Sequence, residues 1–319
     1  MAKQFIVGCL GLLMMLPFTS CKQEKKQGKW QDTTTTGMIP IACDECFLPI
    51  IKEEINVFES IYKSATILPI YTDEVESIDL LIKDSVRVAV VSRGLTENEK
   101  AIIKSKRMEV RERKIAVDAI ALIVNRSNPD SLMGIPTLQK ILTGDVTTWE
   151  QINPASKLGK IDVMFDNPNS STVRYAIDSL CRGRKLSETL YAQKNNMDVV
   201  NMVSKLPNGL GIIGVNWVSN ENDSTNMSFN DKIKVMYVSR YEHATLENSY
   251  QPYQAYIALD DYPMTRNVYI LLSDPRSGLS TGFTSFVMSD RGQKIILKSG
   301  ILPATQPVRI VSVKDEYPN

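Results

Sequence analysis

Apolar residues alternate between strand and helix spacing from residue 38 to residue 91, and this alternation most constrains the fold. The strand-like segments 39–43 and 67–71 are each followed by apolar residues at helical spacing. The next one, Val86–Val91, is apolar apart from Arg87, which is typical of a strand buried on both faces. Repetition of strand and helix predicts an α/β fold with a largely parallel sheet.

A longer apolar strand is predicted over Lys114–Asn125, interrupted only by Asp118 and followed by a turn signal at Ser127–Pro129. A strand longer than its neighbours is a candidate for passing between two lobes. The chain without its first residues, about 280 residues, is long enough for two lobes with separate cores. The sequence therefore favours two α/β lobes connected through this strand.

The stretch Ile161–Leu180 predicts a strand, a polar turn over 166–169 and a helix opened by Ser170, Ser171 and Thr172. The first amide N–H groups of a helix have no partner within it, and the dipole's positive end points outward. Small hydroxyl residues leave room for an anion and add donors of their own. The alternative for Ser170 is a plain N-cap.

The first residues of the chain have the features of a secretory leader. Phe5–Leu16 is apolar but too short to span a bilayer, and small residues precede Cys21. We expect a lipoprotein signal peptide over 1–20 and lipidation of Cys21; the alternative is an ordinary signal peptide with an incidental cysteine. Residues 21–36 are polar and lysine-rich, which predicts a flexible tether.

Composition excludes several function classes. The chain has 37 Lys and Arg against 36 Asp and Glu, so nothing suggests nucleic-acid binding. His243 is the only histidine and cannot build a metal site alone, so we expect it on the solvated surface. No hydrolase, zinc-protease or P-loop motif occurs, and we expect neither an enzyme nor a cofactor.

A C-x-x-C pattern, Cys43 and Cys46, lies where a strand should pass into a helix. A redox role would need this junction in a thioredoxin-like fold, which the later motifs contradict. A local disulfide or two free thiols are the remaining alternatives. Cys181 lies on the apolar side of a predicted helix and is expected to be a small buried hydrophobe.

Seven segments, in order and over almost the whole mature chain, resemble the PstS-like phosphate-binding component of bacterial ABC importers, a type II periplasmic binding protein. These segments are VAVVSRGLTENE, DAIALIVNRSNP, LQKILTGDVTTW, NSST, GLGIIGV, YPMTRNVYILL and SDRGQKIILKSGILPA. The resemblance implies two lobes, each a central mostly parallel sheet flanked by helices, joined by two crossover strands. Residues 37–118 with 256–319 would form lobe 1, and residues 119–255 would form lobe 2.

The ligand positions that the resemblance implies depart from the family. Its first anion loop of glycine, serine and threonine is replaced here by the segment from Cys43 to Cys46. Its acid before the Ser-Arg pair falls on Arg87, and its arginine before the hydroxyl-rich helix start falls on Asp166. Asp44 would either compete with an anion for the same amides or accept a hydrogen bond from monoprotonated phosphate.

Both lobes offer further candidates. Arg93 is either a bidentate clamp on an oxyanion or part of a salt bridge to Asp166 or Asp44. Asn169 is either a ligand contact or a turn former, and Arg87 is expected in a structural ion pair. The full set of candidate ligand residues is Asp44, Glu45, Ser92, Arg93, Asn169, Ser170, Ser171 and Thr172.

The sequence therefore predicts a lipid-anchored extracytoplasmic binding protein that captures a small oxyanion, inorganic phosphate first, in an inter-lobe cleft. Its partners would be an ABC transporter permease and, through the lipid anchor only, a membrane. The alternative is a repurposed binding fold that serves as an envelope sensor or interaction protein, or that binds another small ligand. Thiol–disulfide chemistry at Cys43 and Cys46 is a third hypothesis.

Overall fold

The structure is a computed structural model that describes residues 32–219 and 228–305. The predicted signal peptide, Cys21 and most of the predicted tether lie outside the described residues. The last tether residues differ from the prediction. Asp32 accepts a hydrogen bond from the Leu279 amide (2.7 Å), and Thr33 donates its N–H to the Thr36 carbonyl (3.0 Å). Residues 32–36 are therefore held against the body by backbone and carboxylate hydrogen bonds.

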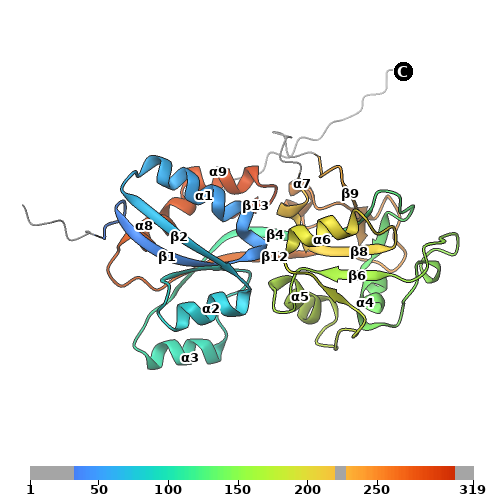
Figure 1. The fold of residues 1–319 in the computed structure, drawn as a ribbon, viewed down its shortest axis with the longest axis horizontal. Helices are drawn as coiled ribbons and strands as arrows, with labels where there is room; N and C mark the ends of the chain where they lie inside the picture. The colour runs from blue at the N-terminus through green and yellow to red at the C-terminus, as the bar shows by residue number, and fades with distance from the viewer. Residues whose placement is uncertain (1–31, 220–227, 306–319) are drawn as a thin grey trace, which may run out of the picture. The chain divides into compact units, whose positions relative to one another are not determined.

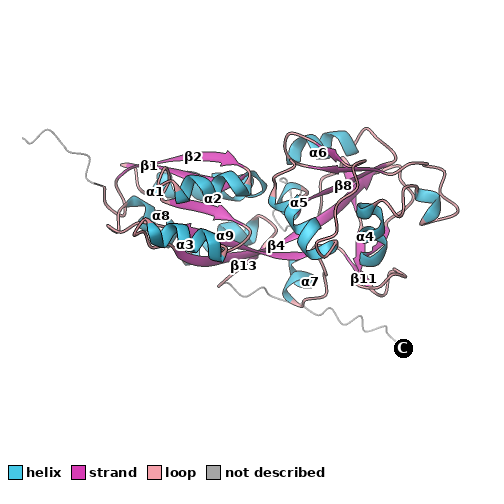
Figure 2. Cartoon of the chain, turned by 90° about the horizontal axis from the view of Figure 1, so that it is seen from below, coloured by secondary structure: helices cyan, strands magenta, loops and turns pink. Residues whose placement is uncertain are grey.

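The first lobe is built from both ends of the described chain (Figure 1). Three parallel strands run in the order β2-β1-β3, and β12 pairs antiparallel with β3. Helices α2 and α3 lie on one side of these strands, with α1, α8 and α9 on the other (Figures 1 and 2). The elements are β1 (Gly37–Asp44), α1 (Leu48–Ile61), β2 (Ala65–Thr72), α2 (Glu74–Ile82), β3 (Val88–Val91), α3 (Glu97–Ser105), β12 (Thr265–Leu272), α8 (Leu279–Val287), α9 (Asp290–Lys298) and β13 (Leu302–Pro303).

The predicted crossing strand is confirmed as β4 (Arg111–Asn125), the longest strand of the sheet. Its residues 111–119 pair with β12 in the first lobe, whereas residues 120–125 pair with β8 and β9 in the second. The Ile120 amide also donates to the carbonyl of Met264, just before β12 (2.8 Å). One continuous sheet, ordered β2-β1-β3-β12-β4-β8-β6-β7, therefore runs through both lobes.

The second lobe surrounds β6 and β8, which are parallel to each other. A small additional sheet, β11-β10-β5, lies beside it. Residues 233–239 join this lobe, because β9 pairs with β4 and β10 pairs with β5. The elements are β5 (Leu132–Gly134), α4 (Ile135–Thr143), β6 (Asp162–Phe165), α5 (Ser171–Tyr175), β7 (Tyr191–Ala192), α6 (Asn196–Val203), β8 (Gly209–Gly214), β9 (Ile233–Val235), β10 (Tyr237–Ser239), β11 (Ser249–Tyr250) and α7 (Gln254–Ala258).

Helix termini follow local chemistry. Thr96 and Glu99 form a capping box at the start of α3. Helix α4 begins at Ile135, because Pro136 favours its first turn. Helices α8 and α9 are separate, because Ser289 caps a new start and accepts from the Gly292 amide (3.5 Å).

Candidate functional site

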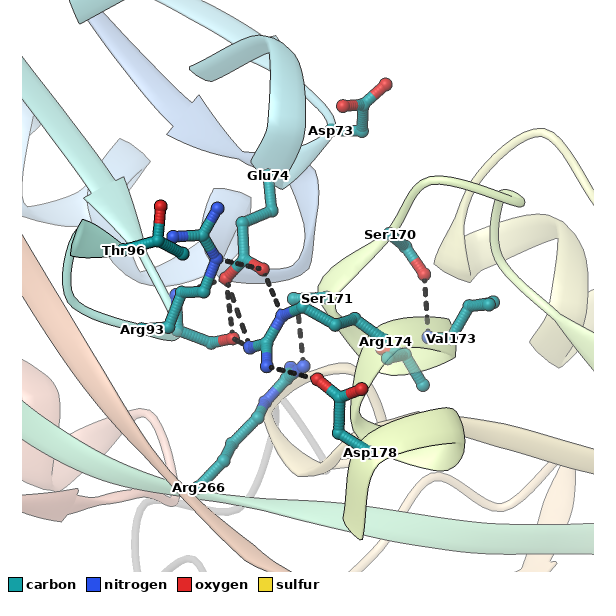
Figure 3. Close-up of polar contacts among 12 residues, drawn as sticks. Asp73, Glu74, Arg93, Thr96, Ser170, Ser171, Val173, Arg174, Asp178 and Arg266 are labelled. Carbon is teal, nitrogen blue, oxygen red and sulfur yellow. Dashed lines mark hydrogen bonds and ion pairs between the residues drawn. The ribbon is translucent and has the colours of Figure 1, made fainter. Parts of the chain in front are cut away.

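Arg266 lies at the centre of a buried polar cluster between the two lobes. Its position on β12 places it directly opposite Asp118 on β4, and its Nε donates to Asp118 Oδ2 (2.9 Å). Its Nη1 donates to the Ser171 hydroxyl in the second lobe (2.8 Å), as Figure 3 shows. The guanidinium also lies 5.1 Å from the centre of the Phe47 ring, a cation–π distance. Burial raises the pKa of the Asp118 carboxyl, and the arginine partly offsets this rise.

The three hydroxyl residues at the start of α5 are all buried. Ser170 caps the helix: its Oγ accepts from the Val173 amide (3.2 Å, Figure 3) and donates to Asp166 Oδ1 (2.5 Å). Ser171 donates to Cys46 Sγ (3.5 Å), and Thr172 Oγ1 lies 3.4 Å from the same sulfur. These predicted anion donors are thus hydrogen-bonded to the chain's own groups.

The segment after β1 closes the cluster from the first lobe. Asp44 Oδ1 accepts from the Cys46 amide (3.0 Å), which confirms the predicted helix-cap role. Burial, and then the charge of Glu74, raises the pKa of Asp44 to about 7. The Cys46 thiol donates to Asp166 Oδ2 (3.2 Å), and Glu45 accepts from Asn196 Nδ2 (2.6 Å).

Several buried polar atoms in this cluster have no hydrogen-bond partner among the described residues. They are Asp44 Oδ2, Asp118 Oδ1, Asn196 Oδ1, Asn216 Oδ1 and Arg266 Nη2. A side-chain carbon on Gly214 would meet Asn216 Oδ1 at 2.8 Å and Arg266 Nη2 at 3.5 Å, so these two atoms lie beside a glycine backbone. Buried polar groups in folded proteins are nearly always paired with protein or water. The cluster therefore offers donors and acceptors for a small polar molecule.

A second polar group joins the lobes through Glu74, Ser92 and Arg174. Figure 3 shows Glu74 and Arg174 pointing toward each other. Glu74 begins α2, and its buried carboxylate accepts from Arg174 Nε on α5 (2.5 Å) and from the Ser92 hydroxyl (2.7 Å). Burial alone raises the pKa of Glu74, but Arg174 and Ser92 outweigh it and bring that pKa below its usual value.

Arg93 pairs differently from either sequence alternative. Its guanidinium makes two 2.8 Å hydrogen bonds to the carboxylate of Glu99, the residue that completes the capping box of α3. Its Nε is 3.7 Å from Glu74 Oε2. The predicted salt bridge to Asp166 or Asp44 is wrong, because Glu99 is closer along the chain and matches the guanidinium in a bidentate geometry.

The remaining candidates lie away from the cluster. Asn169 is exposed in the turn before α5, where its amide donates to Asn167 Oδ1 (2.8 Å). Arg87 forms the predicted structural ion pair, with Asp274 (3.7 Å), and His243 is exposed. Cys43, Cys46 and Cys181 are buried free thiols, so the disulfide alternative for the C-x-x-C pattern is wrong. Burial raises the pKa of both C-x-x-C thiols well above the usual range.

Sequence reasoning missed Glu74, Arg174 and Arg266. A signal for Arg266 was available, because Asp118 interrupts one long apolar strand and an arginine interrupts another. A buried carboxylate in a sheet needs a partner on the neighbouring strand. No comparable local signal marks Arg174, whose partner Glu74 lies 100 residues away in sequence.

Replacing Asp44 with asparagine should flatten the pH dependence of stability between pH 4 and 7. The folded pKa of about 7 exceeds the ordinary value of 3.8. The carboxyl therefore favours folding below pH 3.8, and this contribution is lost as pH rises through 7, by about 1.4 kcal/mol per pH unit. Asparagine keeps the acceptor for the Cys46 amide. Urea unfolding at pH 5, 6 and 7 measures the slope, and equal slopes in both proteins would contradict the assignment.

Comparisons with known proteins agree with this architecture. The PBP superfamily domain matches residues 30–291. The phosphate-binding protein PstS of Pseudomonas aeruginosa is 24% identical over 218 residues, which cover 63% of this chain and 62% of that protein. PstS of Staphylococcus aureus is 24% identical over 220 residues, with coverages of 66% and 62%. This chain thus matches 62% of the length of these curated relatives.

Solved structures show the same fold. A Clostridium perfringens protein assigned as a phosphate ABC transporter substrate-binding protein, with bound phosphate, matches with a TM-score of 0.70 at 18% identity. A Vibrio cholerae ABC-type phosphate transport receptor matches with a TM-score of 0.62 at 21% identity. Each alignment covers 84% of this chain and 100% of the other. No described helix is long and apolar enough to cross a membrane. The predicted two-lobed type II fold is confirmed, and the chain belongs to the PBP superfamily.

Proposed function

We propose that this protein is an extracytoplasmic solute-binding protein that captures a small oxyanion, inorganic phosphate first, between its two lobes. The observation that carries the proposal is the group of unpartnered buried atoms around Arg266. A protonated oxyanion carries both O–H donors and oxygen acceptors, so it can satisfy an arginine N–H and carboxylate or amide oxygens together. The phosphate-binding relatives support this choice of ligand.

The ligand residues proposed from the sequence act in this arrangement from both lobes. Ser171 would donate its hydroxyl hydrogen bond to the anion instead of to Cys46 Sγ. Arg266 Nη1 would continue to donate to the Ser171 hydroxyl and so hold this side chain in place. Asp44 would accept a hydrogen bond from the ligand's O–H group through its unpartnered oxygen. Asn169 drops out of the proposed set, since it is exposed in a turn.

The wider role follows from the chain's start and from its family. The leader and Cys21 support lipid anchoring outside the cytoplasm, with residues 21–31 as a tether. Lobe 1, residues 37–118 and 256–319, and lobe 2, residues 119–255, would close over the anion and present it to an ABC importer permease. Closure would turn about the crossing segments of β4 and β12.

Phosphate should raise the unfolding temperature of the chain from residue 22 onward and bind with a micromolar or tighter dissociation constant. The described residues, 32–219 and 228–305, belong to one compact unit, so this form retains the folded body. Ligand that binds only the folded state stabilises it by mass action. The measurement is thermal unfolding and isothermal titration on protein refolded free of ligand, with sulfate, molybdate and acetate alongside. No shift and no heat at millimolar phosphate would contradict phosphate as the ligand.

A repurposed binding fold is the second candidate, and the local charge favours it. The buried or half-buried carboxylates near the cluster are Asp44, Glu45, Glu74, Asp118 and Asp166, against the guanidiniums of Arg93, Arg174 and Arg266. Excess negative charge opposes a dianion. The protein would then be an envelope sensor, an interaction protein or a binder of another small molecule. Isothermal titration would in that case show no heat of binding with any of the anions tested.

A further inference from the structure

The carboxylate of Glu74 is held by the kinds of group that bind oxyanions. Glu74 Oε1 accepts from the Ser92 amide (2.9 Å), the Ser92 hydroxyl (2.7 Å) and Arg174 Nη2 (3.4 Å). Glu74 Oε2 accepts from Arg174 Nε (2.5 Å) and lies 3.7 Å from Arg93 Nε. A backbone amide, a hydroxyl and a forked guanidinium together form a donor set that suits a carboxylate, a phosphate or a sulfate equally.

Glu74 is not needed to start its own helix. Asp73 already caps α2 by accepting from the Glu76 amide (2.9 Å). An acidic residue in the first turn usually stays in water, as Glu97 does in the equivalent position after Thr96 in α3, where its side chain is 90% exposed. The side chain of Glu74 is instead 1% exposed and points away from its helix toward the second lobe (Figure 3).

The contact connects elements that belong to different lobes. Glu74 and Ser92 lie in the first lobe, at the start of α2 and after β3, whereas Arg174 lies on α5 in the second. Arg174 Nη2 also donates to the Ser92 hydroxyl (2.7 Å), so the guanidinium contacts the first lobe through two residues. Its other partner, Asp178, lies on its own lobe at 3.4 Å with a more exposed side chain. The Glu74–Arg174 pair is therefore a link between the lobes.

We propose that Ser92 and Arg174 form an oxyanion site whose occupant in the ligand-free protein is the carboxylate of Glu74. This built-in anion keeps the lobes together, and a dissolved oxyanion enters the site only by displacing it. The ligand class is a small anion with at least two oxygens, such as phosphate or sulfate. The inference deepens the proposed function, because it adds a recognition position and an internal competitor to the cluster around Arg266.

Competition of this kind lowers apparent affinity by the fraction of molecules in which the internal anion is displaced. It also sets a minimum affinity for binding, because an anion that binds weakly cannot displace the Glu74 carboxylate, which is part of the chain. A purely structural ion pair would behave differently: neutralising Glu74 would weaken folding and leave anion affinity unchanged. Anion affinity thus separates the two roles.

The test compares Glu74→Gln with the unaltered chain and with the matched control Glu97→Gln. Glutamine keeps the shape and removes the charge, so we expect phosphate and sulfate to bind about tenfold more tightly in isothermal titration. Ligand-free Glu74→Gln should also give a larger radius of gyration in small-angle X-ray scattering, because the inter-lobe link is weakened. Glu97→Gln should change neither value. Adding Arg174→Gln to Glu74→Gln should abolish the gain in affinity.

The outcomes separate this inference from the proposed function. Phosphate binding that is equal in the unaltered chain and in Glu74→Gln overturns the inference and leaves the proposed function standing. Binding that is seen only in Glu74→Gln supports the inference and overturns native phosphate capture. No binding in either protein overturns both. If Glu74→Gln fails to fold, Glu74→Asp shortens the side chain while keeping its charge, and an unchanged affinity there also overturns the inference.

Discussion

Replacing Glu54 with methionine should stabilise the folded protein by about 3 kcal/mol at pH 7. Glu54 lies on α1 and is completely buried, and neither of its carboxylate oxygens has a partner among the described residues. Burial, with a smaller contribution from Glu53, raises its pKa to about 9 from an ordinary value of 4.5. Folding at pH 7 must therefore add a proton to this group, and methionine removes that cost while filling a similar volume.

The sign of the pH dependence follows from the raised pKa. Glu54 favours folding fully below pH 4.5, and this contribution is lost as pH rises through 9. The gain from Glu54→Met should thus grow from pH 6 to pH 9. Urea unfolding at these pH values measures it. Glu53→Met, an exposed neighbour on the same helix, is the control and should change stability by less than about 0.5 kcal/mol. A gain that does not grow with pH would refute this account.

Replacing Arg266 with methionine should destabilise the protein by about 4 kcal/mol, because it leaves the Asp118 carboxylate buried without its partner. Both side chains are almost inaccessible, with 3% and 0% of their surfaces exposed. The same change removes the donor to the Ser171 hydroxyl, so the second lobe loses a contact with β12. Denaturant unfolding measures the loss of stability.

Two controls show whether the buried charge causes this loss. Arg113→Met changes an exposed arginine on the first-lobe half of β4 and should cost less than about 0.5 kcal/mol. Adding Asp118→Leu to Arg266→Met should recover most of the stability, because an apolar pair replaces an unpaired charge. A double variant no more stable than the single one would show that the cost comes from packing instead.

The fold was predictable because its signals are local and repeated. The short apolar run Val88–Val91 favours a strand buried on both faces, and β3 is buried at every position. The length of β4 indicated a crossing strand. The splitting of α8 from α9 was not predicted, because the apolar pattern continues through Ser289 while a serine cap restarts the hydrogen bonding.

The site was predictable only in part, because its charges pair across the sheet and between lobes. Ser170 to Thr172 were found from a helix start, which is a local pattern. Glu74 also follows a helix cap, where an acidic residue is ordinary, and nothing in its neighbourhood reveals burial against Arg174. Arg93 was assigned distant partners, although a local one, Glu99, lay six residues ahead. Local propensity identifies caps, whereas the tertiary fold decides which caps are buried.

The position of β12 in the sheet sets an order for the assembly of the chain. β12 lies between β3 and β4, yet it is made long after both of them. A growing polypeptide therefore holds two open strand edges until residues 265–272 emerge, and open edges readily pair with other chains. The middle lobe, by contrast, can pair β4, β6, β8 and β9 before β12 exists. A chain that stops short of residue 265 would keep those open strand edges, so the synthesis of β12 is the step that closes the sheet between β3 and β4.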